Sequence, residues 1–292
     1  MSVAPILVTG ATGKLGRLIV DRLLALGQPV RVFTRRPDAA RVLFGETVQV
    51  AAGDFDDRKA LDAAVHGIGR LLLLSPINAR LVTDQIAVVD AAVAANAARI
   101  VKISGSDWTI EPPGSSISGA AHAAVERHLN GLAAKTVSLR PNAWMQVSLA
   151  NTIKQAIANG QVIAANLDAG IGYIDARDIA DVAVHQLLAD RLRRRTLILT
   201  GPDVVSFRQI STLLAAELKR PVAALDKPPQ TVPGDGDFEH RAVAQFARLI
   251  AAGRAATTTD VVPTLLGRPP RTVAAFILEQ VAAMTAVPEY QP

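Results

Sequence analysis

Three glycines, Gly10, Gly13 and Gly16, carry the strongest chemical signal in the sequence. They lie between an apolar segment, Ile6–Thr9, and an amphipathic one, Leu15–Leu26, which predicts a strand, a tight turn and a helix. Gly10 permits the turn, Gly13 lets a diphosphate approach the backbone, and Gly16 allows close helix–strand packing. Free N–H groups at the helix N-terminus then bind the anion. We therefore expect a dinucleotide site that also includes Thr12, Lys14 and Leu15.

The end of the second predicted strand, Val30–Thr34, indicates which dinucleotide is bound. An acidic residue there would bind a ribose 2′-hydroxyl, but the chain continues with Arg35 and Arg36 and has no carboxylate before Asp38. A guanidinium can pair with a 2′-phosphate, and Lys14 could add a second cation. We expect NADP(H). The alternative is that both arginines are merely solvated.

Other residues follow the predicted strands at the edge where such folds bind ligands. Asp54 and Phe55 come after the third strand and are expected to contact adenine; a helix N-cap at Asp56 or Asp57 is a compatible alternative. Ser75 and Ser104 end the fourth and fifth strands and are assigned to the cofactor site.

Short apolar runs alternate with longer amphipathic ones, a pattern typical of βαβ units. We predict an α/β fold, a Rossmann-type doubly wound parallel sheet, with a smaller and mostly helical C-terminal substrate region. The cofactor-binding core is placed at 1–150 and the substrate or lid region at 151–292. Strands near 172–175 and 196–200 are expected to return to the core. The stretches 228–236 and 263–270, rich in Pro and Gly, read as connectors.

Three of the scarce large aromatic residues, Trp108, Trp144 and Tyr173, fall in loops or at element ends near the predicted mouth of the crevice. They are expected to line an apolar substrate pocket. The alternative for each is a place in the core.

Composition excludes several other functions. The chain of 292 residues has a net charge of +5, but aromatic residues make up only 4%, so no set of aromatic and basic residues is available for base stacking. The basic run at 191–195 reads as a solvated helix end. With no cysteine and no metal-ligand spacing, we expect neither a disulfide nor a metal. No export or membrane segment is evident, so a cytoplasmic protein is expected, with no nucleic-acid or membrane partner.

Taken together, these motifs resemble the atypical, NmrA-like branch of the short-chain dehydrogenase/reductase superfamily. The resemblance covers nearly the whole chain and includes the quinone-oxidoreductase-like and agroclavine-dehydrogenase-like reductases. Its motifs are Thr9–Gly16, Gly53–Asp54, Ile103–Ser104, Leu139–Pro141, Tyr173–Ala180, Thr200–Pro202 and Leu266–Pro270.

The chain departs from that superfamily at its catalytic pair, Tyr-x-x-x-Lys, which usually precedes a Glu by four residues. Counting back from Glu126 places His122 at the lysine position and Ser118 at the tyrosine position. Both are candidate catalytic residues, and His122 could supply the proton, because histidine titrates near neutral pH. The alternatives are that His122 only binds the cofactor ribose or packs against the loop.

The resemblance implies an NADPH-dependent oxidoreductase that transfers hydride to a small unsaturated acceptor: an imine or iminium, a quinone, an azo compound or a carbonyl. The alternative is a non-catalytic NADP(H) sensor of the NmrA type, which the missing Tyr/Lys pair would favour. An isomerase or epimerase ranks third, because it needs that acid–base pair. A homodimer is left open.

Overall fold

A seven-stranded parallel sheet forms the centre of the molecule. The computed structural model describes residues 3–228 and 237–285. In sequence order the strands are β1 Ile6–Thr9, β2 Val30–Thr34, β3 Gln49–Ala52, β4 Arg70–Leu73, β5 Arg99–Ile103, β6 Lys135–Pro141 and β8 Thr196–Leu199. In the sheet they lie in the order β3-β2-β1-β4-β5-β6-β8, all parallel. The order reverses between β1 and β4, and a ligand crevice is expected there.

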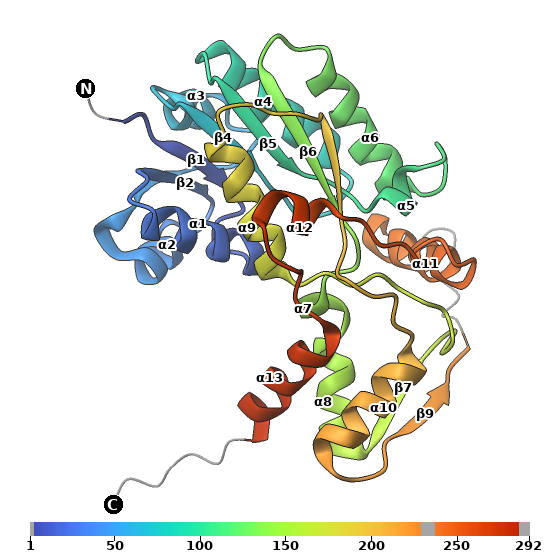
Figure 1. Cartoon of the computed structure of the whole chain (residues 1–292). Coiled ribbons are helices and arrows are strands. Elements are labelled where there is room, and N and C mark those ends of the chain that lie inside the picture. Colours follow the sequence, from blue (N-terminus) through green and yellow to red (C-terminus); the bar gives the residue numbers. More distant parts are fainter. Residues whose placement is uncertain (1–2, 229–236, 286–292) are drawn as a thin grey trace, which may run out of the picture.

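Helices cover both faces of the sheet (Figure 1). One face carries α1 Lys14–Ala25, α2 Pro37–Phe44, α9 Ala176–Leu188 and α12 Val261–Leu266; the other carries α3 Arg58–Val65, α4 Leu81–Ala94 and α6 Ile117–Asn130. Each face of the sheet has its own hydrophobic core, the first under α1 and α9 and the second under α3, α4 and α6. In β1 the side chains of Ile6 and Val8 lie in the first core and that of Leu7 lies in the second. Apolar residues at consecutive positions are typical of a strand buried on both faces. This confirms the predicted Rossmann-type fold.

A second group of elements lies beyond the carboxyl ends of the strands (Figure 1). It contains a parallel pair, β7 Gln161–Ala164 and β9 Ala223–Asp226, and the helices α7 Met145–Ser148, α8 Ala150–Asn159, α10 Phe207–Leu218 and α13 Val273–Thr285. A third core, which includes Ile153, Leu214 and Phe276, holds α8, α10 and α13 together. Two helices, α5 Asp107–Ile110 and α11 Phe238–Ala251, contact each other near α6, and η1 Gly45–Thr47 precedes β3. A boundary at residue 150 stays a prediction, because α9, β8 and α12 return to the sheet.

Local structure differs from prediction at three places. Residues 172–175 form no strand: Ile174 makes only an isolated bridge with Trp144, and Asp175 instead caps α9 by accepting the Arg177 N–H. The expected connector 263–270 begins inside α12, because a proline is tolerated in the first turn of a helix. Of the connector at 228–236, residues 229–236 lie outside the described residues. The arginine run at 191–195 is largely exposed chain that follows the end of α9.

Among the described residues, no helix has both the length and the apolarity needed to cross a bilayer.

Candidate functional site

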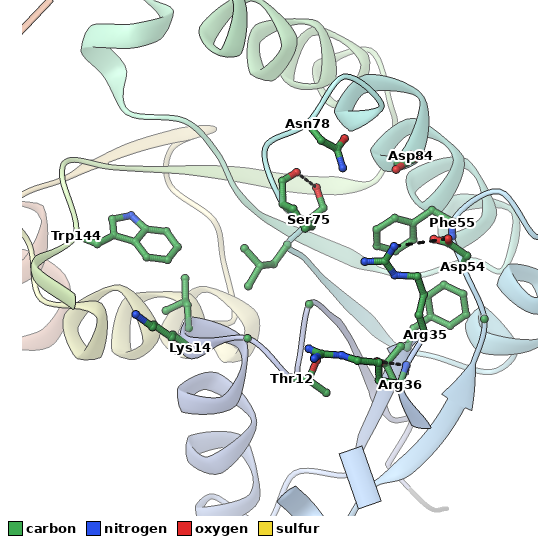
Figure 2. Close-up of a pocket in the computed structure, with 18 residues that line it drawn as sticks. Thr12, Lys14, Arg35, Arg36, Asp54, Phe55, Ser75, Asn78, Asp84 and Trp144 are labelled. Carbon is green, nitrogen blue, oxygen red and sulfur yellow. Dashed lines mark hydrogen bonds and ion pairs between the residues drawn. The ribbon is translucent and has the colours of Figure 1, made fainter. Parts of the chain in front are cut away.

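A cleft of about 340 Å³ opens where the strand order reverses. Figure 2 shows its labelled side chains: Arg35, Arg36, Asp54 and Phe55 gather on one side, and Lys14 and Trp144 lie on the other. The cleft is lined by Gly10, Thr12, Gly13, Lys14, Leu15, Phe33, Thr34, Arg35, Arg36, Gly53, Asp54, Phe55, Leu74, Ser75, Pro76, Asn78, Asp84 and Trp144.

The glycine loop forms the floor of the cleft. Gly10 has a φ of +64°, in the left-handed region that favours glycine. A Cβ on Gly16 would lie 2.1 Å from the Gly10 carbonyl oxygen, so the close approach of loop and helix requires a glycine there. Gly16 does not line the cleft and serves this packing instead. Gly13 is the N-cap of α1 and no side chain caps the helix, so its first N–H groups are available to an anion.

Two exposed arginines stand at one side of this loop. The Arg36 guanidinium donates to Thr12 Oγ1 at 3.1 Å, which ties the end of β2 to the loop after β1. The Arg35 guanidinium lies 3.9 Å from a carboxylate oxygen of Asp54, at the end of β3. Phe55 stacks in a tilted arrangement against Phe33, with ring centroids 5.9 Å apart. This side therefore combines positive charge with an aromatic surface.

Lys14 points away from the arginines, to the opposite side of the cleft (Figure 2). Its Nζ donates to the Gln146 carbonyl oxygen at 3.3 Å, and Trp144 lies beside it. Gln146 is held in turn by Asp175, whose carboxylate accepts from the side-chain amide at 2.8 Å. In this structure Lys14 therefore lies apart from Arg35 and Arg36, and its contact with a 2′-phosphate stays a prediction.

The two serines that follow β4 and β5, Ser75 and Ser104, have different surroundings. Ser75 lines the cleft and accepts from Gln85 Nε2 at 2.8 Å. Ser104 is not among the residues that line the cleft; it is buried and donates to Glu126 Oε1 at 2.6 Å.

A buried polar network lies between β5, β6 and α6. Because α6 begins at Ile117, Ser118, His122 and Glu126 all lie within it, one turn apart, and all three are buried. Lys102 of β5 places its Nζ 2.8 Å from Nδ1 of His122 and 3.3 Å from Ser104 Oγ. Glu126 also forms an ion pair with Arg140 at 2.5 Å, and Arg140 reaches Asp107 at 2.7 Å.

Burial dominates the electrostatics of this network. It lowers the pKa of Lys102 to about 7, although the nearby Glu126 carboxylate opposes the shift. Burial also lowers the pKa of His122 well below its ordinary value, and the positive charges of Lys102 and Arg140 add to the effect. The His122 imidazole is therefore neutral at physiological pH.

The remaining candidates lie away from the cleft. Ser118 is 1% exposed. Trp108 packs edge-on against Phe246 and donates to Asn142 Oδ1 at 2.7 Å; it borders a separate cavity of about 190 Å³ with Arg140 and Arg254. Tyr173 belongs to the third core and is 1% exposed. Of the three predicted pocket aromatics, only Trp144 lines the cleft.

Sequence reasoning missed Asn78 and Asp84 in the cleft and Lys102 beneath His122. The signal for Lys102 was present in the sequence, because it is a charged residue inside the otherwise apolar run Ile100–Ile103, and charged side chains are rarely buried without a partner. Within the described part of the chain, no group of three metal-ligating side chains could hold a metal ion.

The residues of the cleft fit a phosphorylated dinucleotide. An uncapped helix N-terminus opens onto the cleft beside a glycine loop, and two exposed guanidinium groups lie within the same cleft. No rearrangement of the backbone is needed to present these donors.

Comparisons with known proteins agree with this geometry. Residues 10–190 match a family model described as NAD(P)H-binding. The chain is 31% identical over 280 residues to a (4-alkanoyl-5-oxo-2,5-dihydrofuran-3-yl)methyl phosphate reductase of Streptomyces griseus, covering 91% of this chain and 94% of the relative. It is 30% identical to an NAD(P)H azoreductase of Xenophilus azovorans, covering 96% and 99%.

Among solved structures, the fold is similar to an NADPH-dependent quinone oxidoreductase of Escherichia coli complexed with NADPH. The TM-score is 0.80 at 21% identity, covering 96% of this chain and 99% of the other.

Proposed function

The chain belongs to the NAD(P)H-binding family, and from this premise we propose that it is an NADPH-dependent reductase of small unsaturated acceptors. When bound, the cofactor supplies the hydride. The observation that carries the proposal is that one cleft is lined by the uncapped N-terminus of α1, by Arg35 and Arg36, and on the opposite side by Trp144.

Different residues along the cleft bind different parts of the cofactor. The N–H groups at the start of α1 hold the diphosphate, and the Arg35 and Arg36 guanidinium groups pair with a 2′-phosphate. Asp54 and Phe55 border the adenine. Arg35 is exposed and its contact with Asp54 is long, so it can reorient toward a phosphate at little cost.

The acceptor binds near Trp144, and the apolar residues Leu74 and Pro76 also line the cleft. A flat apolar surface favours a planar conjugated acceptor. Two relatives named for reduction of a dihydrofuranone phosphate and of azo compounds, and the quinone oxidoreductase of similar fold, support this class. We propose a quinone, an azo compound, an imine or iminium, or a carbonyl.

Beside Trp144 the described lining of the cleft places an ammonium group, that of Lys14, which donates to the Gln146 carbonyl oxygen, and no carboxyl group. Of the described lining residues, Asp54 and Asp84 carry carboxylates; Asp54 lies near Arg35, and Asp84 pairs with Arg80 at 3.0 Å. An iminium needs no proton, and a quinone or azo compound can take protons from water. These acceptors therefore suit the cleft lining without further assistance.

The test measures NADPH and NADH binding by the purified protein, and then NADPH oxidation with quinones, azo dyes, iminium salts and aldehydes. Acceptor-dependent oxidation supports the reductase. Tight NADPH binding without turnover on any acceptor would instead favour the alternative, a non-catalytic NADP(H) sensor.

A further inference from the structure

Lys102 is a fully buried lysine in the middle of the sheet. Its Nζ contacts the Ile103 carbonyl oxygen and Ser104 Oγ, both at 3.3 Å, and Nδ1 of His122 at 2.8 Å. The nearby Glu126 carboxylate is taken up by Ser104 and Arg140. Burial of an ammonium group without a directly paired carboxylate is costly, so a purely structural role would be better served by an apolar side chain.

The contact with Lys102 determines which nitrogen of His122 carries its hydrogen. A charged lysine only donates, so Nδ1 must accept and the hydrogen of the neutral ring lies on Nε2. Within the described residues, His122 makes a side-chain hydrogen bond only through Nδ1. Nε2 is therefore a donor available to another group.

The imidazole of His122 packs closely against Gly105, on the side of the ring that carries Cδ2. A Cβ on Gly105 would lie 2.7 Å from His122 Cδ2, the ring carbon bonded to Nε2. Gly105 is half-buried and follows β5, at the carboxyl edge of the sheet, where the cleft also opens. A larger residue at position 105 would displace the imidazole.

We propose that Lys102 and His122 form a proton relay to acceptors whose reduction leaves a negative charge, an inference that rests on the proposed reductase function. As a carbonyl carbon gains hydride, its oxygen takes the proton from His122 Nε2. Nδ1 of the same ring takes a proton from the Lys102 ammonium, so the imidazole stays neutral and changes only its tautomer. The neutral Lys102 amine then regains a proton from water, and the ring returns to its first tautomer.

The surrounding charges suit this exchange. The groups that face the pair are Ser104 just after β5, Glu126 on α6 and Arg140 on β6, with Asp107 of α5 beyond Arg140. Burial lowers the pKa of Lys102 to about 7, so the ammonium can both lose and regain a proton at neutral pH. The low pKa of His122 keeps the ring neutral, as the relay requires.

The test compares wild type, Lys102→Met and His122→Asn on one aldehyde and one iminium salt. Asn retains an oxygen near the position of Nδ1 but cannot pass a proton on. We expect both variants to lower aldehyde kcat by about a hundredfold or more, within the range for general acid catalysis, and to change iminium kcat little. Lys135→Met, which removes an exposed lysine at the start of β6, is the matched control and should behave as wild type.

The pH profile separates a relay from a structural role. Wild-type aldehyde kcat should fall as pH rises above about 7, because Lys102 loses its proton, and Lys102→Met should lack this decline. A Lys102→Met protein with wild-type aldehyde kcat and pH profile would overturn the relay. If Lys102→Met does not fold, His122→Asn gives the same comparison of acceptors.

Failure of the relay and failure of the reductase function remain distinguishable. Turnover of iminium or quinone but of no carbonyl overturns the relay alone. If no acceptor is reduced, the reductase proposal fails, and ¹⁵N chemical shifts of the His122 ring still test the pair. If Lys102 donates to Nδ1, the wild-type His122 ring should carry its hydrogen on Nε2, and the population of this tautomer should fall in Lys102→Met. A wild-type ring with its hydrogen on Nδ1 would refute the pairing.

Discussion

Lys102 Nζ lies 2.8 Å from His122 Nδ1, and both side chains are buried between β5 and α6. From the resemblance of the sequence, His122 is expected to stand where the superfamily's helix carries a lysine. In this structure a lysine side chain from the neighbouring strand contacts His122.

Lys102 should lower the free energy of unfolding, and by more at low pH than at high pH. Its pKa is about 7 in the folded protein and near 10.5 when unfolded, so between these values the unfolded state binds more protons. Wild-type stability should therefore rise with pH across this window, and Lys102→Met should lack that rise. At pH 6.5 we expect Lys102→Met to be more stable by about 1–4 kcal/mol in urea denaturation. Parallel stability curves for the two proteins would contradict this expectation.

Arg35→Glu should change the cofactor preference. A carboxylate at this position would repel a 2′-phosphate, so the preference for NADPH over NADH should fall by about tenfold or more. Fluorescence titration at fixed ionic strength gives both dissociation constants. Arg41→Glu is the control, because Arg41 is an exposed residue that pairs with Asp38 and does not line the cleft. An unchanged preference in Arg35→Glu would remove Arg35 from the 2′-phosphate site.

Trp144→Ala should weaken acceptor binding and leave the arginine side of the cleft intact. The KM for a quinone or azo dye should rise by about tenfold, in keeping with the loss of one aromatic contact surface. The NADPH dissociation constant should change less than the acceptor KM. Trp108→Phe, a change at the separate cavity, serves as the comparison. If Trp144→Ala raised the acceptor KM and the NADPH dissociation constant by the same factor, Trp144 would not be a specific contact of the acceptor.

Asp178 should be essential for the attachment of the C-terminal segment. Its buried carboxylate accepts from the Arg271 backbone N–H at 2.7 Å and pairs with Arg268 at 2.8 Å, which joins α9 to the chain after α12. Asp178→Ala removes this carboxylate but leaves Asp181, which pairs with both arginines, so the variant should lose about 1–3 kcal/mol of unfolding free energy. Asp62→Ala breaks an exposed pair with Arg58 and should barely move the urea midpoint. Similar midpoints for both variants would contradict this role.

Much of the fold and the cofactor cleft could be predicted because the signals are local. The apolar strands and the spacing of Gly10, Gly13 and Gly16 depend on neighbours in sequence, and the structure forms β1, the turn and α1 from them. Arg35 and Arg36 follow a strand whose end must lie at the cleft, so their place could also be inferred.

The rest depends on side-chain directions and distant partners. Lys14 lies in the loop, yet its long side chain extends to Gln146, more than a hundred residues away in the chain. Tyr173 comes just before a helix cap but is drawn into the third core. The pairing of Lys102 with His122 requires the registration of β5 against α6, which spacing within either element does not determine.

A single-turnover experiment tests the central claim most directly. Enzyme in excess over NADPH is mixed with a quinone, whose reduction takes one hydride, and the absorbances of cofactor and acceptor are followed together. The reductase account predicts that both decay at one rate and in equal molar amounts. Bound NADPH that persists unchanged with every acceptor would contradict it.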